Sequence, residues 1–354
     1  MTEKRKSKIK LNVAVRMPNW IGDAVLATPF LYFLKKYLPQ SRLILVMRKK
    51  VKDVFQHNPY VDKMIVIDDK KKGLFSTLKE GIKLRKLDLD LFFILPDSLS
   101  SAVHSCFSRA RLKIGYRKEA RSVFLNIKPD NPGRTIHRAF KYLELLEEYL
   151  VAHGNHNRAS IKKDFLKNTK ARIFLTKEEI KQADLILKPF PGKKIGFNPN
   201  ASAVSRRWFP DRFAALADEI AKHPGNNIIF FGDKKEKVYV DRILKMMKQR
   251  GVNLAGFLSL RQYMAVLSKL DLFITNDTGP MHLANAVLTP VIAIEGAASV
   301  PETGMVNKVK SQYIIKKVDC GPCVKNECHK GLQCLDLIRV KDVLEAVRKY
   351  LQSI

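Results

Sequence analysis

The sequence lacks any run of about 18 uninterrupted apolar residues, the length that a membrane-spanning helix needs. The basic opening MTEKRKSKIK is followed by LNVAVR, whose six residues are too few for the apolar core of a secretory signal peptide. Cysteine is scarce as well, and 5 cysteines in 354 residues do not make the disulfide framework of a secreted protein. We therefore expect a cytoplasmic protein that spans no membrane and touches a membrane only peripherally.

Acidic residues are under-represented: 34 Asp and Glu stand against 65 Lys and Arg, which gives a net charge of +31 and a pI near 9.9. Residues 1–170 hold 36 basic and 16 acidic residues (+20), and residues 171–354 hold 29 and 18 (+11). Nucleic acid, an anionic membrane surface and a phosphorylated substrate all fit this charge, as does a generally cationic surface. Because no RNA-binding motif or aromatic platform interleaves with the basic residues, we expect no nucleic-acid partner.

The chain is long enough for two domains of roughly 150 residues each. Apolar runs of strand length alternate with helical segments in two series, which is typical of parallel sheets covered by helices. The sequence predicts an α/β protein of two doubly wound, Rossmann-like domains, 1–172 and 173–354, that face a central cleft, and the last helix can pack back on the first domain. The predicted strands are 11–16, 42–47, 63–67, 89–95, 194–198, 227–231, 270–275 and 290–294, and the main predicted helices are 23–38, 211–223, 234–250, 259–269 and 279–288.

Neither a G-x-G-x-x-G nor a P-loop pattern is present, but three strand-to-helix loops concentrate unusual residues. In the first, Gly22 and Asp23 open a helix directly after a strand. Asp23 is either a helix-start residue that satisfies backbone amides or a general base facing the cleft, with Gly22 permitting close approach of a ligand. A helix start favours the ionised carboxylate, which keeps such a base available but weakens it.

The second loop spans residues 198–208 and combines small hydroxyl residues, an asparagine suited to a left-handed turn, and the adjacent Arg206 and Arg207. Arginines before a helix can hold a pyrophosphate. The alternative is an ordinary loop with Trp208 packed beneath it.

The third loop leads from Asn276 into a helix whose first backbone amides can bind an anion, while Asp277 or Thr278 can hold sugar hydroxyls. His282 lies one turn into that helix and is either a ligand contact or a structural histidine. Glu236 follows a predicted strand at the place where doubly wound nucleotide sites put an acid against ribose hydroxyls. An exposed glutamate in a basic run is the alternative for Glu236.

Four of the cysteines fall within fifteen residues as C-x2-C-x4-C-x5-C, namely Cys320, Cys323, Cys328 and Cys334. The first pair has the spacing by which two thiolates grip one metal ion. The second pair is spaced more widely than in common zinc or cluster motifs, so reduced loop cysteines and a local disulfide stay open beside a metal site.

Several segments together resemble glycosyltransferase family 9, and the resemblance covers nearly the whole chain. The segments are RMPNWIGDAVLATP (16–29), the triplet GYR (115–117) with the following Arg121, GFNPNASAVSRRW (196–208), NDTGPMH (276–282) and the cysteine cluster. The resemblance implies a GT-B fold with an amino-terminal acceptor-binding domain and a carboxyl-terminal nucleotide-sugar domain.

The family's chemistry is implied in the same way: inverting transfer of heptose from ADP-heptose to the anionic heptosyl-Kdo-lipid A inner core of lipopolysaccharide, without cofactor or catalytic metal, at the cytoplasmic face of the inner membrane. Another family 9 transferase with a different acceptor is the alternative. Asp23 matches the family's general base. The implied donor-binding residues are Ser202, Arg206, Glu236, Asp277, Thr278, Gly279 and His282, and the implied acceptor-binding residues are Asn19, Trp20, Arg117 and Arg121.

Two positions depart from the family pattern. Where the family commonly has glycine after the proline of the second loop, this chain has Asn200, which must then take the glycine's place in the turn. Arg206 stands where the family usually has a phosphate-binding lysine, which keeps the charge and changes its geometry.

Overall fold

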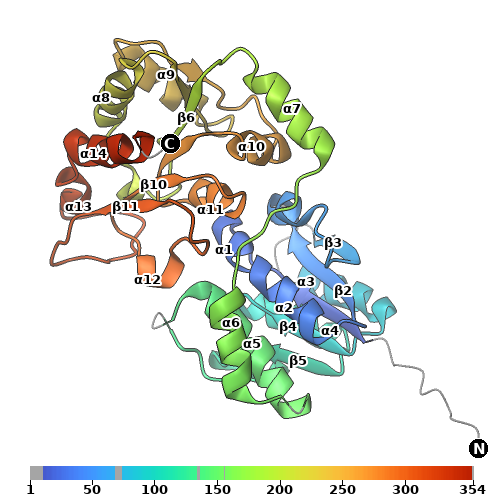
Figure 1. The fold of residues 1–354 in the computed structure, drawn as a ribbon. Coiled ribbons are helices and arrows are strands. Elements are labelled where there is room, and N and C mark those ends of the chain that lie inside the picture. The colour runs from blue at the N-terminus through green and yellow to red at the C-terminus, as the bar shows by residue number, and fades with distance from the viewer. Residues whose placement is uncertain (1–10, 68–73, 134–135, 155, 353–354) are drawn as a thin grey trace, which may run out of the picture. The chain divides into compact units, whose positions relative to one another are not determined.

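The computed structural model of the protein describes residues 11–67, 74–133, 136–154 and 156–352. The chain folds into two compact units, Met1–Ala171 (unit 1) and Arg172–Ile354 (unit 2), which run from blue to green and from green to red in Figure 1. Each unit has its own parallel sheet and its own apolar core.

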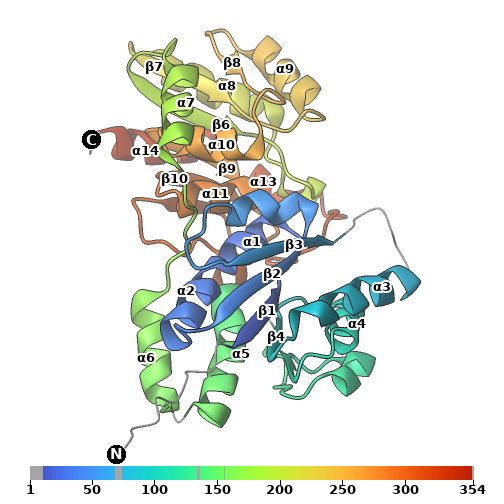
Figure 2. The ribbon, with the colours of Figure 1, turned by 90° about the vertical axis from the view of Figure 1, so that its right-hand side faces the viewer.

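Unit 1 is built on a 5-stranded parallel sheet in the order β3-β2-β1-β4-β5. Helices α2 and α5 pack together, as do α3 and α4, and Figure 2 shows the two pairs on opposite faces of the sheet. The strands are β1 (Asn12–Arg16), β2 (Arg42–Arg48), β3 (Lys63–Ile67), β4 (Leu91–Ile94) and β5 (Leu112–Gly115). The helices are α1 (Ile21–Leu26), α2 (Thr28–Tyr37), α3 (Leu74–Leu84), α4 (Leu99–Phe107), α5 (Arg138–His153) and α6 (Arg158–Asn168), with 3₁₀ turns at Lys49–Phe55, Arg85–Leu87 and Glu119–Phe124.

The central strands of unit 1 are apolar on both faces because helices cover both sides of the sheet. Ala14 and Phe92 belong to one core cluster, while Phe93, the next residue along β4, packs edge to face on Phe30 of α2 at 5.2 Å between ring centroids. The sheet therefore brings the carboxyl ends of β1 and β4, and the loops that follow them, to one edge.

The single helix predicted over 23–38 is two helices, because Pro29 interrupts the hydrogen-bond ladder at Ala27. Pro29 has no N–H to donate to the carbonyl of Val25 four residues earlier. The Thr28 hydroxyl donates to that carbonyl instead, at 2.8 Å. The short α1 that results carries Gly22 and Asp23.

Unit 2 is built on a 6-stranded parallel sheet in the order β11-β10-β9-β6-β7-β8. The strands are β6 (Lys193–Asn198), β7 (Asn226–Phe230), β8 (Val252–Asn253), β9 (Leu272–Asn276), β10 (Val291–Glu295) and β11 (Gln312–Ile315). The helices are α7 (Lys177–Leu187), α8 (Pro210–Ala221), α9 (Lys237–Met246), α10 (Leu260–Leu267), α11 (Gly279–Ala286), α12 (Val300–Thr303), α13 (Gln333–Asp336) and α14 (Val340–Leu351), with a 3₁₀ turn at Val204–Arg206.

One core cluster of unit 2 lies between the sheet and the helices α8, α9 and α14, and it includes the fully buried Trp208. The last helix, α14, contributes Val343 and Val347 to this cluster and packs on α8. On the opposite face Gly196 allows close packing, because a Cβ there would lie 2.5 Å from the Leu270 side chain.

Within the described part of the chain, none of the helices combines the length and apolar character needed to cross a bilayer. The short edge strands β5, β8 and β11 were not among the predicted strands, since two to four residues give too little alternation to be recognised.

Candidate active site

Asp23 lies in the first turn of α1, directly after the carboxyl end of β1. No side chain caps this helix at Trp20, whose backbone is extended. The Asp23 side chain is 22% exposed, and its Oδ1 accepts from Nη1 of Arg138, the first residue of α5, at 3.3 Å. An adjacent guanidinium favours the ionised carboxylate, which is the form that a general base needs. Sequence reasoning missed Arg138, because only the fold brings α5 to α1.

Two predicted acceptor residues precede Asp23 in the same loop. Asn19 accepts a hydrogen bond from Nη2 of Arg16 at 2.8 Å, which fixes the loop to the end of β1. Trp20 is 60% exposed, and the Lys50 ammonium lies 4.6 Å from its ring centroid. The loop therefore presents an indole face and a cation to solvent, a combination suited to a phosphorylated sugar.

The structure separates the other two predicted acceptor residues. Arg117 is largely exposed and pairs with Asp130 at 3.3 Å. Arg121 is only 2% exposed, donates to the carbonyl of Pro96 at 3.0 Å and lies 3.6 Å from Asp97. The direct acceptor contact predicted for Arg121 disagrees with this burial, because a guanidinium under the loop cannot meet a ligand arriving from solvent. Arg121 instead holds the chain that follows β4.

In unit 2 the neighbouring strands β6, β9 and β10 end side by side with Asn198, Asn276 and Glu295. Asn276 ties down both ends of the second loop: its Nδ2 donates to the carbonyl of Pro199 at 2.8 Å, and its Oδ1 accepts from the backbone N–H of Trp208 at 3.0 Å. The indole N–H of Trp208 donates to the carbonyl of Ile338 at 3.0 Å. The loop 198–208 is thus packed on Trp208 and is also held in a defined position. An ordinary loop packed on Trp208 and a loop that holds a pyrophosphate are therefore compatible interpretations.

This fixed loop places Arg206 against Asp277, with Nη1 3.0 Å from Oδ2. The Asp277 side chain is 4% exposed, whereas that of Arg206 reaches solvent in part. The Nε of Arg206 is buried and has no partner among the described residues. A partly open guanidinium with spare donors at the carboxyl edge of a sheet can bind a diphosphate bidentately.

Glu295 adds a second buried acid to this pair. Burial, together with the nearby charge of Asp277 and against the effect of Arg206, raises the pKa of Glu295 to about 8. Burial likewise raises the pKa of Asp277 to about 6 against the effect of Arg206. One arginine therefore faces two carboxyl groups, of which Glu295 is neutral at pH 7. Sequence reasoning passed over Glu295, although an acid closing an otherwise apolar strand was the available signal.

The substitution Glu295→Gln is expected to make the free energy of unfolding depend less on pH. A carboxyl group whose pKa is raised on folding stabilises the folded state below its unfolded pKa and loses this contribution as pH rises through the folded pKa. The wild-type free energy of unfolding should fall between pH 5 and 8, by up to about 1.4 kcal/mol per pH unit, and that of Glu295→Gln should fall less. Urea unfolding of both proteins at four pH values checks this, and parallel curves would contradict it.

The remaining donor candidates lie around this group. Thr278 donates to the carbonyl of Asn276 at 3.4 Å, Gly279 begins α11, and His282 is buried in that helix. Ser202 is exposed in the loop after β6. Pro280 has no N–H and the Met281 N–H donates to the carbonyl of Thr278 at 3.1 Å, so Ser202, Thr278 and the N–H of Gly279 are the candidates for contact with a ligand.

Glu236 is half-buried rather than exposed, so the alternative of a solvated glutamate in a basic run is wrong. Its Oε2 accepts from the backbone N–H of Asp233 at 2.8 Å, and burial raises its pKa. Asn200 has no left-handed backbone, which corrects the expectation that it replaces a glycine. Its Nδ2 instead donates to the carbonyl of Phe231 at 3.4 Å, linking the loops after β6 and β7.

A cavity of about 630 Å³ lies at the opposite, amino-terminal edge of the unit 2 sheet, lined by Gly192, Asn226 and the last turns of α14. It is remote from the loops described above. The donor candidates lie instead at the carboxyl ends of the strands, where open α/β sheets bind ligands.

The sequence profile of glycosyltransferase family 9 (heptosyltransferase) matches residues 78–333. Lipooligosaccharide heptosyltransferase 2 of Campylobacter jejuni is 28% identical over 346 residues, which cover 96% of this chain and 99% of that protein. A family 9 glycosyl transferase structure from Veillonella parvula gives a TM-score of 0.82 at 23% identity and covers 98% of this chain and 99% of its own. The structure of E. coli ADP-heptose lipopolysaccharide heptosyltransferase II gives 0.80 at 22% identity, covering 97% and 99%.

Proposed function

Because the chain belongs to glycosyltransferase family 9, we propose that it moves a heptose from ADP-heptose to the heptosyl-Kdo-lipid A inner core of lipopolysaccharide, with inversion and with no catalytic metal. The fold is GT-B, and the enzyme is a heptosyltransferase of lipopolysaccharide core biosynthesis. What we propose beyond this is the identity of the donor and of the acceptor, and the roles of individual residues. The observation that carries it is the Arg206–Asp277 pair, fixed at the end of the unit 2 sheet with Glu295 beside it.

Arg206 is the residue that we assign to the donor diphosphate. Its Nη1 donates to Asp277, and its buried Nε has no partner among the described residues. When the bond between the sugar and ADP breaks, negative charge grows on the leaving phosphate oxygen. Arg206 and the N–H of Gly279 at the start of α11 can stabilise that charge without a divalent cation.

Glu236 and Asp277 are assigned to hydroxyl groups of the donor. Each is a carboxyl group whose pKa is raised by burial. Glu236 follows β7, next to β6 in the sheet, where an acid can bind ribose. Asp277 pairs with Arg206 and can bind the heptose. His282, Thr278, Gly279 and Ser202 are assigned to the rim of the same site.

Asp23 is assigned as the general base. In the transfer step the acceptor hydroxyl oxygen bonds to the anomeric carbon as the bond from that carbon to the ADP oxygen breaks. The hydroxyl proton passes to the Asp23 carboxylate, and ADP leaves with the bonding electrons. Attack from the side opposite ADP inverts the anomeric configuration, as two-carboxylate inverting enzymes do by a similar base step.

The acceptor is assigned to unit 1, whose sequence carries most of the positive charge. Asn19 and Trp20 belong to the loop before Asp23, Arg117 follows β5, and these three residues are the proposed contacts. A phosphorylated lipid at the cytoplasmic face of the inner membrane is an anion that such a surface attracts. A transferase with a different sugar acceptor is the second candidate, and it fits the same donor site.

Trp20→Ala is expected to raise the KM for the acceptor about fivefold, because an exposed aromatic contact contributes about 1 kcal/mol. The donor KM and the melting temperature should stay unchanged, since Trp20 is 60% exposed. Phe257→Ala is the matched control, because Phe257 in unit 2 is equally exposed and also has a lysine, Lys237, over its ring. A Trp20→Ala enzyme with an unchanged acceptor KM would remove Trp20 from the acceptor site.

The proposed function is tested by measuring ADP release with a panel of donors and acceptors. ADP-heptose with a heptosyl-Kdo acceptor should be turned over best, and ADP-glucose and UDP-sugars poorly. Preference for a Kdo acceptor without heptose would favour the second candidate. Absence of turnover with every ADP-sugar would reject the donor assignment.

A further inference from the structure

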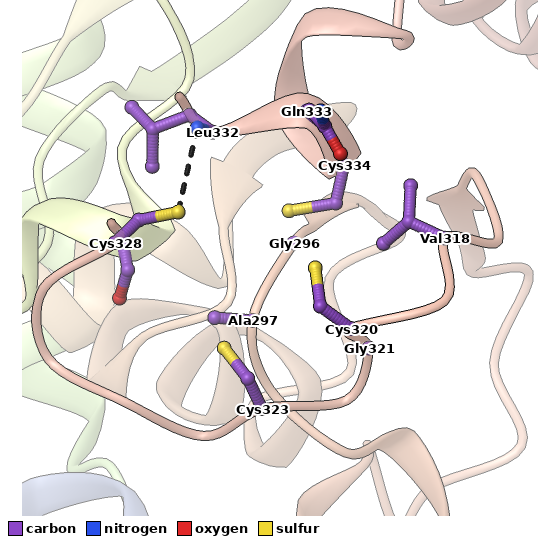
Figure 3. A pocket seen from close by; sticks show the side chains of 11 residues that line it. Gly296, Ala297, Val318, Cys320, Gly321, Cys323, Cys328, Leu332, Gln333 and Cys334 are labelled. Atoms are coloured by element: carbon purple, nitrogen blue, oxygen red, sulfur yellow. Dashed lines mark hydrogen bonds between the residues drawn. The ribbon is translucent and has the colours of Figure 1, made fainter. Parts of the chain in front are cut away.

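The four clustered cysteines come together in unit 2 around one small cavity. Their loop runs from β11 to α13, and the cavity of about 10 Å³ is lined by all four of them together with Gly296, Ala297, Val318 and Leu332. Figure 3 shows the four sulfur atoms turned toward this space. All four cysteines are free thiols in the structure. A space of one atom's size surrounded by four thiols and apolar side chains is a site for a single soft ion.

The backbone around Cys328 contacts its sulfur atom directly. Two backbone N–H groups donate to Sγ: that of Lys330 at 3.3 Å, and that of Leu332 at 3.4 Å, which Figure 3 shows as a dashed line. These two hydrogen bonds hold the Cys328 sulfur in position at the edge of the cavity.

The loop also holds two bulky residues in the left-handed region, where L-residues other than glycine and asparagine are rare. Val324, directly after Cys323, has φ 47°, and Leu332, two residues before Cys334, has φ 56°. Such conformations persist only where the surroundings dictate them, and they gather at functional sites. In this loop they turn the chain so that the sulfurs of Cys323 and Cys334 face the same space.

We propose that Cys320, Cys323, Cys328 and Cys334 bind one thiophilic metal ion, zinc or iron, in a closed four-thiolate site. With the side chains as they stand, no three His, Cys, Asp or Glu residues among those described are close enough to share an ion. Binding therefore requires the four sulfur atoms, which already face the cavity, to move closer together around it. A site with four protein ligands leaves no open position, so the ion is structural and does not enter the transfer reaction.

The position of the cysteine loop indicates a structural role for such an ion. Ser205, the neighbour of Arg206, donates from its Oγ to the carbonyl of Lys325 at 2.5 Å and from its N–H to the carbonyl of Asn326 at 3.2 Å. The N–H of Val324 donates to the carbonyl of Ala297, two residues after Glu295, at 2.7 Å. The cysteine loop thus supports both the Arg206 loop and the end of β10. A metal ion that fixes the cysteine loop would hold the proposed donor site in shape.

The test is the metal content of the full-length protein, purified without a metal-affinity step and without added metal. We expect close to one zinc or iron per chain by elemental analysis, and a sulfur-only first shell by X-ray absorption. Cys323→Ser and Cys334→Ser should each lose most of the metal. Cys106→Ser is the control, because Cys106 lies in α4 of unit 1, and it should keep the metal.

A chromophoric chelator provides a second measurement that needs no variant. Removing the ion should lower the melting temperature by several degrees, and adding zinc to the stripped, reduced protein should restore it at one equivalent. A reduced wild-type protein that holds less than a tenth of an ion and takes up no zinc would overturn the proposal. A disulfide among the four cysteines in protein purified anaerobically, detected by mass, would overturn it as well. None of these measurements depends on the proposed transfer activity.

Discussion

Asp23→Asn is expected to lower kcat by about 10²- to 10⁴-fold, which is the usual contribution of a positioned general base. The amide has nearly the shape of the carboxylate but cannot take the proton of the acceptor hydroxyl. Because Asp23 belongs to unit 1 and the proposed donor residues to unit 2, the affinity for ADP-heptose should not change. Single-turnover kinetics and donor titration by calorimetry measure the two quantities separately.

Asp88→Asn is the control for this substitution. Asp88 is an exposed residue of unit 1 with a left-handed backbone, φ 45°, that asparagine also adopts readily. The activity of the Asp88→Asn enzyme should equal that of the wild type. An Asp23→Asn enzyme that keeps more than a tenth of wild-type kcat would show that another group accepts the proton.

Arg206→Ala is expected to lower kcat/KM by about 10²- to 10³-fold, the range found when one preorganised donor to a developing negative charge is removed. The loss should be divided between a weaker ADP-heptose affinity and a lower kcat, since the charge on the diphosphate grows as the sugar departs. Arg206→Lys should retain part of the activity, because lysine keeps the positive charge and loses the bidentate geometry. Initial-rate kinetics over a range of donor concentrations separate these effects.

Removing Arg206 also leaves Asp277 buried without its cation, so stability has to be measured beside activity. The melting temperature of Arg206→Ala shows whether the protein is still folded at the assay temperature. Lys222→Ala is the control, because the Lys222–Glu219 pair at the end of α8 is exposed. A folded Arg206→Ala protein with wild-type donor affinity would exclude a contact between Arg206 and the diphosphate.

The sequence was sufficient to predict elements with strong local signals. The longer strands and the α/β class were recognisable because parallel strands buried on both faces are continuous apolar runs. Asp23 and the loop after β9 could be selected as site candidates because they follow such strands directly. The break at Ala27 was also within reach, since Pro29 cannot donate the hydrogen bond that a continuous helix would need.

The sequence was insufficient where the position of a side chain depends on residues far along the chain. Arg138 meets Asp23 across 115 residues, and Asn276 reaches back 77 residues to Pro199. Motif matching alone could not show that Arg121 is buried while Arg117 is exposed. The Asn200 backbone was misjudged because its side chain, rather than a left-handed turn, links the two loops. No local pattern encodes such tertiary contacts.

The central claim is that this protein adds one heptose from ADP-heptose to a heptosyl-Kdo-lipid A acceptor with inversion. Its most direct test is the product formed from purified components, identified by mass spectrometry and by the NMR of the new glycosidic bond. We predict an acceptor heavier by one heptosyl residue, one ADP released per transfer, and an anomeric configuration opposite to that of the donor. An unmodified acceptor under conditions where the donor is bound, or a product with retained configuration, would contradict the account.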